Sequence, residues 1–447
     1  STFSVVLPPP ALALLAAALL AGPPAVGRGQ TETPFPAAPA ARLAWDLTTS
    51  LGYDTYVQRF PLAGEDTTET ISEFELAAAA EGRTEGRARH HWRLRPELSV
   101  GTELTRERLE AAWQYCPDST ATALRLDAWW QGRQYRGGTA YSLRSDWQEG
   151  RVEARAVASP RGGQAGEVRL YAARLRYAEP TELALDQDEA GGGVFWRAGH
   201  DAERHFLLGA RLARRAYPDS AAVDRTVAAL EGEYDSRGFG DAGVRAWAHA
   251  ERRRVRDESV RPSAWAGWGG LEWTAPAGAG RLEAGLLGEV WDYDAESSVW
   301  FDSWRLGGTL VYRGGDALDW RWLAGLAAER LDAGPSSPET YNQAGVRAGV
   351  ETIGERLIGE LVVEVGRRDY VYAPPEPAPT AVSLTASLDD LALYSDFTYW
   401  SLWLTAAWTV TERLGVDVSA SWQPEDHTEE ADDSAVAFGF ARLVWRW

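Results

Sequence analysis

Apolar side chains recur at every second residue through long stretches of this chain. In residues 398–410 one side carries Trp400, Leu402, Leu404, Ala406, Trp408 and Val410. The other side is mostly polar or small, although Trp403 interrupts it. Successive side chains of a β-strand point to opposite faces, so this period predicts a strand with one apolar face. Because neither helical heptads nor a long sequence repeat occurs, we expect an all-β fold.

The same alternation returns in the segments 43–54, 121–131, 318–329, 357–368 and 414–423. Aromatic residues stand near the ends of the apolar face, with Leu, Val and Ala between them. That layout is typical of strands that meet lipid between two interfacial girdles. A soluble β-sandwich alternates too, so the second face is more informative. It carries both charge signs and many glycines, strand after strand, which favours a wet lumen.

The composition suits a barrel better than a helical membrane protein. Mean hydropathy is −0.33, and no stretch reaches the roughly 18 apolar residues that a membrane helix needs. Only half of the strand residues of a barrel meet lipid, so a mild average is expected. The net charge of −20 argues against duplex nucleic acid as a partner, because binding its backbone needs a basic face. Cys116 is alone, which excludes an internal disulfide.

Short and long connections alternate along the chain. Short turns are expected at 117–119, 314–316, 353–355 and 411–413, and longer polar ones at 179–190, 256–262, 332–340, 373–393 and 424–434. Bacterial outer-membrane barrels place short turns on one side and long loops on the other. We therefore predict a single antiparallel up-and-down β-barrel of about 20 strands, always an even number. Totals of 16 or 18 are the alternatives, because breaks near 103–107 and 198–203 are hard to place.

The first residues resemble an export signal rather than part of the fold. Residues 11–22 (ALALLAAALLAG) form an apolar run of signal-peptide length, and residues 25–27 offer a small-residue cleavage site. We expect a signal peptide at 1–27 that is shortened at its start, because no basic stretch precedes the run. A flexible Pro/Ala-rich lead-in at 28–41 and the barrel at 42–447 would follow. A buried Ala/Leu helix is the alternative for the run.

The chain ends in the sequence FGFARLVWRW. Trp447, Trp445 and Leu443 share one face of this final strand. This terminus resembles the C-terminal signature of Gram-negative outer-membrane β-barrel proteins. The resemblance implies an outer-membrane location, recognition by the barrel-assembly machinery, and a surrounding of lipid and lipopolysaccharide. A sandwich edge strand that happens to end in Trp is the alternative.

Two sets of side chains are expected to follow from a barrel. The candidate membrane girdle is Trp45, Trp130, Trp320, Trp400, Trp408, Trp422 and Trp445. The candidate lumen-lining residues are Asp46, Glu73, Glu75, Arg125, Asp127, Arg211, Arg245, Glu251, Arg253, Arg321, Glu329, Glu360, Glu364, Arg368, Arg442 and Arg446.

Catalytic, metal and cofactor sites are not expected. Common hydrolase, zinc and phosphate-loop motifs do not occur, and His90 and His91 point to opposite faces as neighbours on a strand. The acidic segment 425–433 could bind divalent cations that bridge lipopolysaccharide, but a solvated loop is favoured. His427 beside Asp426 could imitate an outer-membrane protease, although a loop histidine among acids is usually solvated.

The function that fits these expectations is a passive porin or channel. Small polar solutes would pass through a lumen in which arginines oppose carboxylates. The alternative is a non-conducting barrel that acts structurally, or as a surface-interaction protein through its outer loops. In that case the same charges would pair into a structural network. An enzyme is the third possibility.

Overall fold

The computed structural model describes most of the region predicted to form the barrel. The described ranges are 42–62, 65–85, 89–102, 104–115, 122–135, 146–158, 163–180, 184–199, 205–236, 242–295, 300–315, 320–334, 339–371, 395–428 and 433–447. The predicted signal peptide, the lead-in and the predicted loop 373–393 lie outside these residues.

The described residues form twenty strands and one short 3-10 helix. The strands are β1 Arg42–Leu62, β2 Glu65–Glu85, β3 His90–Gly101, β4 Leu104–Tyr115, β5 Thr122–Tyr135, β6 Trp147–Ala158, β7 Gln164–Tyr177, β8 Gln187–Gly199, β9 His205–Ala216, β10 Arg225–Asp235, β11 Gly243–Val255, β12 Ala264–Ala277, β13 Gly280–Tyr293, β14 Ser303–Gly315, β15 Arg321–Asp332, β16 Tyr341–Ile353, β17 Leu357–Tyr370, β18 Phe397–Thr409, β19 Leu414–His427 and β20 Ser434–Arg446. The helix η1 is Ala221–Val223. The predicted count of about 20 is confirmed, and both uncertain breaks are real connections.

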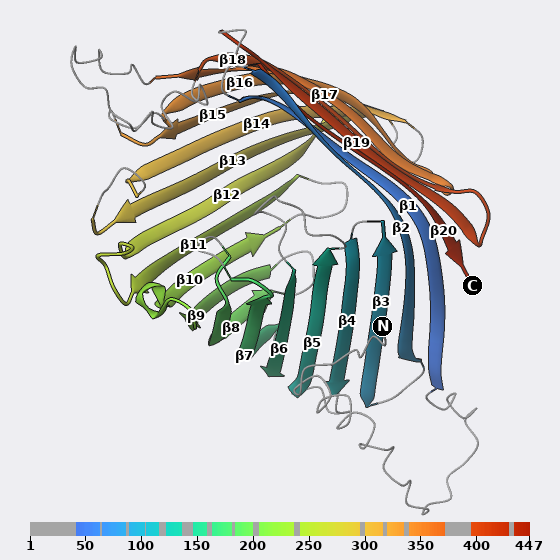
Figure 1. Ribbon diagram of the computed structural model, residues 1–447, viewed down its shortest axis with the longest axis vertical. Helices are drawn as coiled ribbons and strands as arrows, with labels where there is room; N and C mark the ends of the chain where they lie inside the picture. Colours follow the sequence, from blue (N-terminus) through green and yellow to red (C-terminus); the bar gives the residue numbers. More distant parts are fainter. Residues whose placement is uncertain are drawn as a thin grey trace, which may run out of the picture.

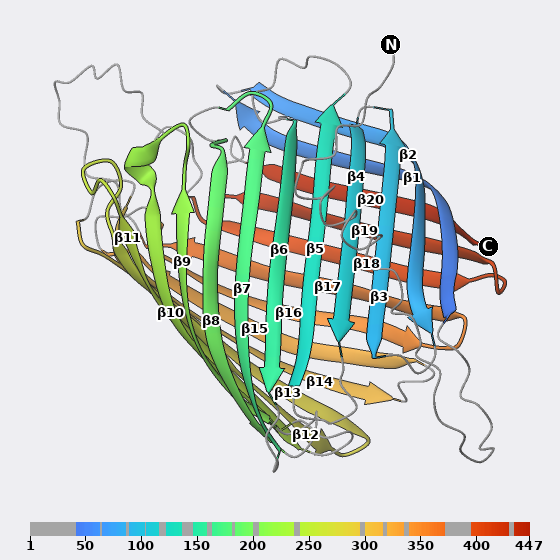
Figure 2. The same ribbon diagram turned by 90° about the horizontal axis from the view of Figure 1, so that it is seen from below.

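Each strand pairs antiparallel with the next, and β1 also pairs with β20. Figures 1 and 2 show the sheet curling until the first strands lie beside the last. Residues 48–59 of β1 run opposite residues 446–435 of β20. Closure leaves no open edge at that seam, which is how a sheet satisfies its backbone groups in hydrocarbon. The predicted up-and-down barrel is confirmed.

From β5 onward, the connections differ in length between the two ends of the barrel, as predicted. The first strands depart from the prediction, because the connections 63–64 and 102–103 lie at the end with the longer connections and have two residues each. One end carries short connections such as 278–279, 354–356 and 410–413, together with the start of β1 and the end of β20. The other end carries longer ones such as 178–186 and 371–396. In outer-membrane barrels the short turns face the periplasm and the long loops face outward. We call these the periplasmic end and the outer end.

Ion pairs between strands that are not neighbours identify the inner face. Such pairs are Arg106–Glu75 (3.0 Å), Arg211–Glu251 (3.8 Å) and Arg313–Glu351 (2.7 Å). Each skips over one strand, and side chains of next-but-one strands converge only on the concave side of a curved sheet. The opposite face carries exposed apolar residues, among them Leu51, Leu230 and Leu326. Charged side chains therefore lie mainly on the inner face, and apolar side chains mainly on the outer face. Outward-facing charges such as Arg174 and Arg330 lie near the outer ends of their strands.

Glycines on the strands make room for aromatic rings on their neighbours. The directly opposed pairs are Trp45–Gly82, Phe195–Gly209, Trp247–Gly270, Trp322–Gly314 and Tyr399–Gly366. A Cβ on any of these glycines would lie under 3 Å from the opposing ring. The rings thus lie flat over the neighbouring strand, which accounts for part of the glycine content.

Several predicted boundaries are wrong. The predicted loop 179–190 ends four residues early, because β8 begins at Gln187. Residues 424–427 are not loop, because β19 continues to His427. Their charged composition resembles a loop, but an inner face tolerates charge, so the strand extends through it. The strand predicted at 318–329 begins at Arg321, which places Trp320 just before it.

Among the described residues, no helix is long and apolar enough to cross a bilayer.

Candidate functional site

The inner face of the barrel is the candidate site. The pairing registers place all the predicted lumen-lining residues on this face, from Asp46 on β1 to Arg446 on β20. A strand brings every second residue to one side, so a correct alternation places them together. What the alternation does not give is which of these charges touch.

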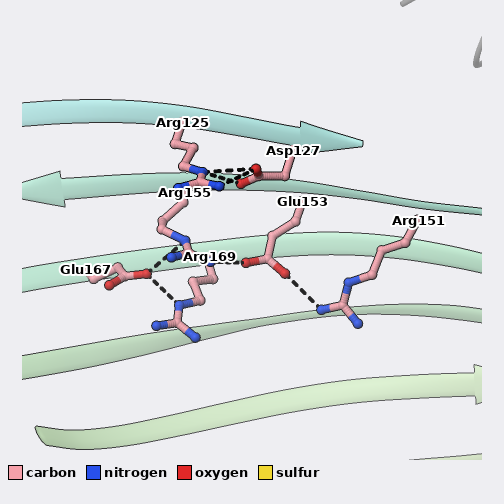
Figure 3. Close-up of polar contacts among 7 residues, drawn as sticks. All are labelled: Arg125, Asp127, Arg151, Glu153, Arg155, Glu167 and Arg169. Carbon is pink, nitrogen blue, oxygen red and sulfur yellow. Dashed lines mark hydrogen bonds and ion pairs between the residues drawn. The ribbon is translucent and has the colours of Figure 1, made fainter. Parts of the chain in front are cut away.

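A ladder of alternating charges crosses β6 and β7 (Figure 3). Glu153 accepts hydrogen bonds from Arg151 and Arg155, both at 2.9 Å. Arg155 also lies 3.1 Å from Glu167, which accepts a further bond from Arg169. The five side chains thus form a continuous series of opposite charges on the wall. Each carboxylate is shared by two guanidiniums, so the positive charges exceed the negative ones.

Aromatic rings flank this ladder at both of its ends. The guanidinium of Arg151 lies 4.1 Å from the ring centre of Tyr171, a distance at which a cation is attracted to the ring face. Arg169 lies equally close to the ring of Phe195. The Tyr171 hydroxyl donates to Glu189 at 2.8 Å, and Glu189 in turn accepts from Arg215 at 2.6 Å.

A second cluster centres on Glu251 of β11, whose side chain is 5% exposed. His249 lies 3.1 Å from this carboxylate, and Arg253 also donates to it. Arg211 approaches from β9. The imidazole of His249 stacks on Trp268 with ring centres 4.0 Å apart. Charge and aromatic packing together make this part of the wall dense.

A hollow of about 260 Å³ lies on the wall near the outer end of β13 to β16. Its lining is Glu289, Trp291, Ser303, Arg305, Leu331 and Tyr341. Glu289 accepts from the Trp291 indole at 2.7 Å and from Arg305 at 2.6 Å. The hollow therefore combines an aromatic surface with a charged pair.

The sequence already places Trp403 on the polar side of its strand, and the register confirms that it faces inward. Sequence reasoning missed the other tryptophans of the inner face, which are Trp129, Trp147, Trp247, Trp268 and Trp291. Each falls among the polar positions of its strand, so the alternation contained the signal. Where a tryptophan directly precedes or follows a girdle residue, as Trp129 precedes Trp130, both are easily assigned to the outer face.

The predicted girdle residues Trp45, Trp130, Trp400, Trp408, Trp422 and Trp445 all lie on the outer face. Trp320 is exposed beside the periplasmic end. At the chain end, Leu443 and Trp445 project from the same outer face. The Trp447 amide donates to the Leu47 carbonyl at 3.0 Å.

The expectation that His427 is solvated is wrong. Its side chain is 6% exposed, because the register turns it inward at the end of β19. The Ser395 hydroxyl lies 2.6 Å from its Nδ1, and Glu425 lies 3.7 Å from its Nε2. The ring also packs against Phe397.

Two connections at the outer end are joined to each other. The amide of Arg256 donates to the Asp224 carbonyl at 2.8 Å, and that of Asp257 donates to the Ala222 carbonyl at 3.0 Å. Hydrogen bonds from the Ser259 hydroxyl and amide lower the pKa of Asp257. Arg252 lowers the pKa of Asp294 in the next connection. These contacts give the outer rim a defined shape between β9 and β14.

No grouping of His, Cys, Asp and Glu suited to a metal ion occurs within the described ranges.

No protein-family model matches the chain, and no curated protein sequence matches it either. Among solved structures, the copper transporter OprC aligns with a TM-score of 0.52 at 11% identity, covering 90% of this chain and 80% of that one. The siderophore receptor PirA from Pseudomonas aeruginosa aligns at 0.50 and 8% identity, covering 89% and 80%. Pseudomonas aeruginosa OccK1 (OpdK) aligns at 0.48 and 12% identity, covering 90% and 98%.

At these identities the likeness concerns the fold. Together with the closed sheet and the apolar outer face, it places the chain among the integral β-barrels of the bacterial outer membrane.

Proposed function

We propose that this barrel is a passive channel for small polar solutes, with its charged inner face lining the path. The observation that carries the proposal is the wall itself, where guanidiniums and carboxylates alternate from strand to strand. Such a wall is costly unless it meets water or is fully paired, and several of its members are exposed. Examples are Arg106 and Arg305, whose side chains are about half exposed.

The size of the barrel supports a water-filled path. Porins of roughly 16–18 strands already enclose an aqueous channel, and diameter grows with strand number. Opposed charges along such a path set up a field across it, which favours small polar solutes over apolar ones. The wall would therefore select by polarity and charge.

A hydrolase is a second candidate, because the Ser395 hydroxyl contacts His427 and His427 contacts Glu425. A nucleophile, its base and an orienting acid have the same arrangement. We infer a structural role instead. The histidine is almost wholly buried, and its contact with Glu425 at 3.7 Å is too long for a firm hydrogen bond. The Ser395 contact fixes the start of β18 to the end of β19. Labelling of Ser395 by a serine-directed fluorophosphonate would contradict this reading.

Planar lipid bilayers test the channel. We expect stable ohmic steps from the refolded protein. Glu360 has no ion-pair partner among the described residues, so Glu360→Gln should lower the preference for cations. Arg245 lies 3.0 Å from Glu233, so Arg245→Gln frees that carboxylate and should raise the preference.

The matched control is Leu326→Ala on the outer face, which should change neither conductance nor selectivity. Silence at high protein dose, in a preparation whose heat-modifiable migration shows a folded barrel, would refute the channel. It would favour the non-conducting barrel that acts through its outer loops.

A further inference from the structure

Four arginines gather inside the barrel at the outer end of β9 to β12. Arg225 begins β10 and stands directly opposite Arg215 of β9. Arg253 of β11 and Arg261 of the following connection are also among its electrostatic neighbours. Like charges directly opposite each other on a sheet destabilise it. The cluster therefore needs compensating negative charge.

The described residues supply only part of that compensation. Arg215 is paired with Glu189, and Arg253 is paired with Glu251. Neither Arg225 nor Arg261 lies within ion-pair distance of a carboxylate among the described residues. The Nε of Arg225 is buried and has no hydrogen-bond partner there. A charged donor left in this state costs free energy, more than a neutral one would.

The neighbouring connections hold the arginine cluster in place, and aromatic rings pack against two of its guanidiniums. The adjoining connections are tied together by the hydrogen bonds of Arg256 and Asp257 described above. The guanidinium of Arg253 lies 4.5 Å from the Trp291 ring centre, and that of Arg261 lies at the same distance from Trp300. Trp291 also lines the hollow of about 260 Å³ beside the cluster.

We propose that Arg225 and Arg261 form a binding station for the oxyanion group of a solute at the outer mouth of the barrel. A guanidinium offers two parallel N–H donors, which match a carboxylate or a phosphate. The apolar part of such a solute would rest on Trp291. The station deepens the proposed channel function by naming the solute class, organic anions. Binding itself does not depend on conduction.

Equilibrium dialysis of the detergent-solubilised full chain tests the station, with radiolabelled inorganic phosphate and benzoate as probes. The two probes separate the tetrahedral from the planar oxyanion. We expect saturable binding of at least one at constant ionic strength, with no competition from equimolar chloride. Arg225→Gln should weaken that binding about tenfold, as loss of a charge-assisted hydrogen bond implies.

Arg313→Gln is the matched control. Arg313 lies near the periplasmic end and is held by Glu283 at 2.9 Å and Glu351 at 2.7 Å. It should leave oxyanion binding unchanged and lower the unfolding temperature, whereas Arg225→Gln should raise that temperature because it removes an uncompensated charge. A rise in stability together with weaker binding supports the station.

Several results would overturn the proposal. They are no saturable binding of either probe, equal weakening by the two variants, or binding that chloride displaces in proportion to its concentration. Because dialysis requires no current, these results differ from silence in the bilayer, which would contradict the channel and leave the station standing.

Discussion

At the scale of single residues, several glutamates of the inner wall each bind two arginines and so link neighbouring ion pairs. Glu153 and Glu167 do so on β6 and β7, and Glu351 holds Arg313 and Arg321 near the periplasmic end. The chain contains no lysine, so every basic partner is a planar guanidinium with donors on two edges. This geometry turns isolated pairs into a network.

Removal of one shared carboxylate should therefore cost more than the loss of one pair. Glu251→Gln leaves Arg253, Arg211 and His249 without their common acceptor on a buried part of the wall. We expect a loss of about 3 kcal/mol in the free energy of unfolding, as for a broken buried ion pair. Urea titration of the barrel refolded in lipid vesicles measures it.

Glu97→Gln is the control for this prediction. Glu97 contacts Arg95 only at 4.0 Å, and both side chains are more exposed. Its loss should cost less than about 1 kcal/mol, as for surface pairs. Equal losses in the two variants would show that sharing of Glu251 contributes nothing.

At the scale of elements, the opposed glycine–aromatic pairs make registers specific. A ring that covers the neighbouring strand fits only where that strand offers a glycine. A Cβ at Gly270 would lie 2.3 Å from the Trp247 ring. Gly270→Val should therefore lift the ring into the lumen and destabilise the barrel by about 1–3 kcal/mol, the usual cost of overpacking.

Gly166→Val provides the comparison, because nothing lies within 4 Å of a Cβ at that position. Midpoints of urea unfolding compare the two variants. A midpoint for Gly166→Val as low as that for Gly270→Val would mean that glycine contributes through the backbone alone.

A substitution at the end of β20 can distinguish an effect on stability from an effect on assembly. The Trp447 side chain is 70% exposed, and its indole donates only to the Thr49 hydroxyl at 3.3 Å. Trp447→Ala should change the free energy of unfolding by less than about 1 kcal/mol, as for exposed sites. If the terminal aromatic is the assembly signal, the amount of folded barrel in cells should still fall several-fold.

Trp408→Ala, on the same outer face and also exposed, should leave assembly in cells largely intact. Immunoblots of unheated outer-membrane fractions report both variants. Equal yields of the two folded barrels would remove the signal function from Trp447.

The sequence predicted the elements better than their contacts. Alternation separated the two faces of β1, β5, β17 and β19, because a strand has only two sides. It could not show that Arg225 faces Arg215, since that register depends on the connections on either side. It also misplaced the end of β19, where charged residues on an inner face resemble a loop. The contacts between functional residues could therefore be identified only from the three-dimensional structure.

At the scale of the whole molecule, the outer face is suited to lipid and the inner face to water. Tryptophan marks both: most of the 22 face outward, while Trp403 projects inward at mid-height of β18 and is 51% exposed. Its neighbour Leu402 lies on the outer face, opposite Trp422. Labelling at these two adjacent positions can therefore test whether the inside of the barrel is open to water.

Cysteine scanning answers this in a Cys116→Ser background, where no other thiol remains. An aqueous lumen predicts that Trp403→Cys reacts quickly with a charged, membrane-impermeant thiosulfonate and Leu402→Cys reacts slowly, because hydrocarbon excludes the reagent. A charged adduct at position 403 should also reduce the single-channel conductance, whereas treatment of the Leu402→Cys barrel should not. Slow reaction at both positions would show a filled lumen, and the charged wall would then be a structural network.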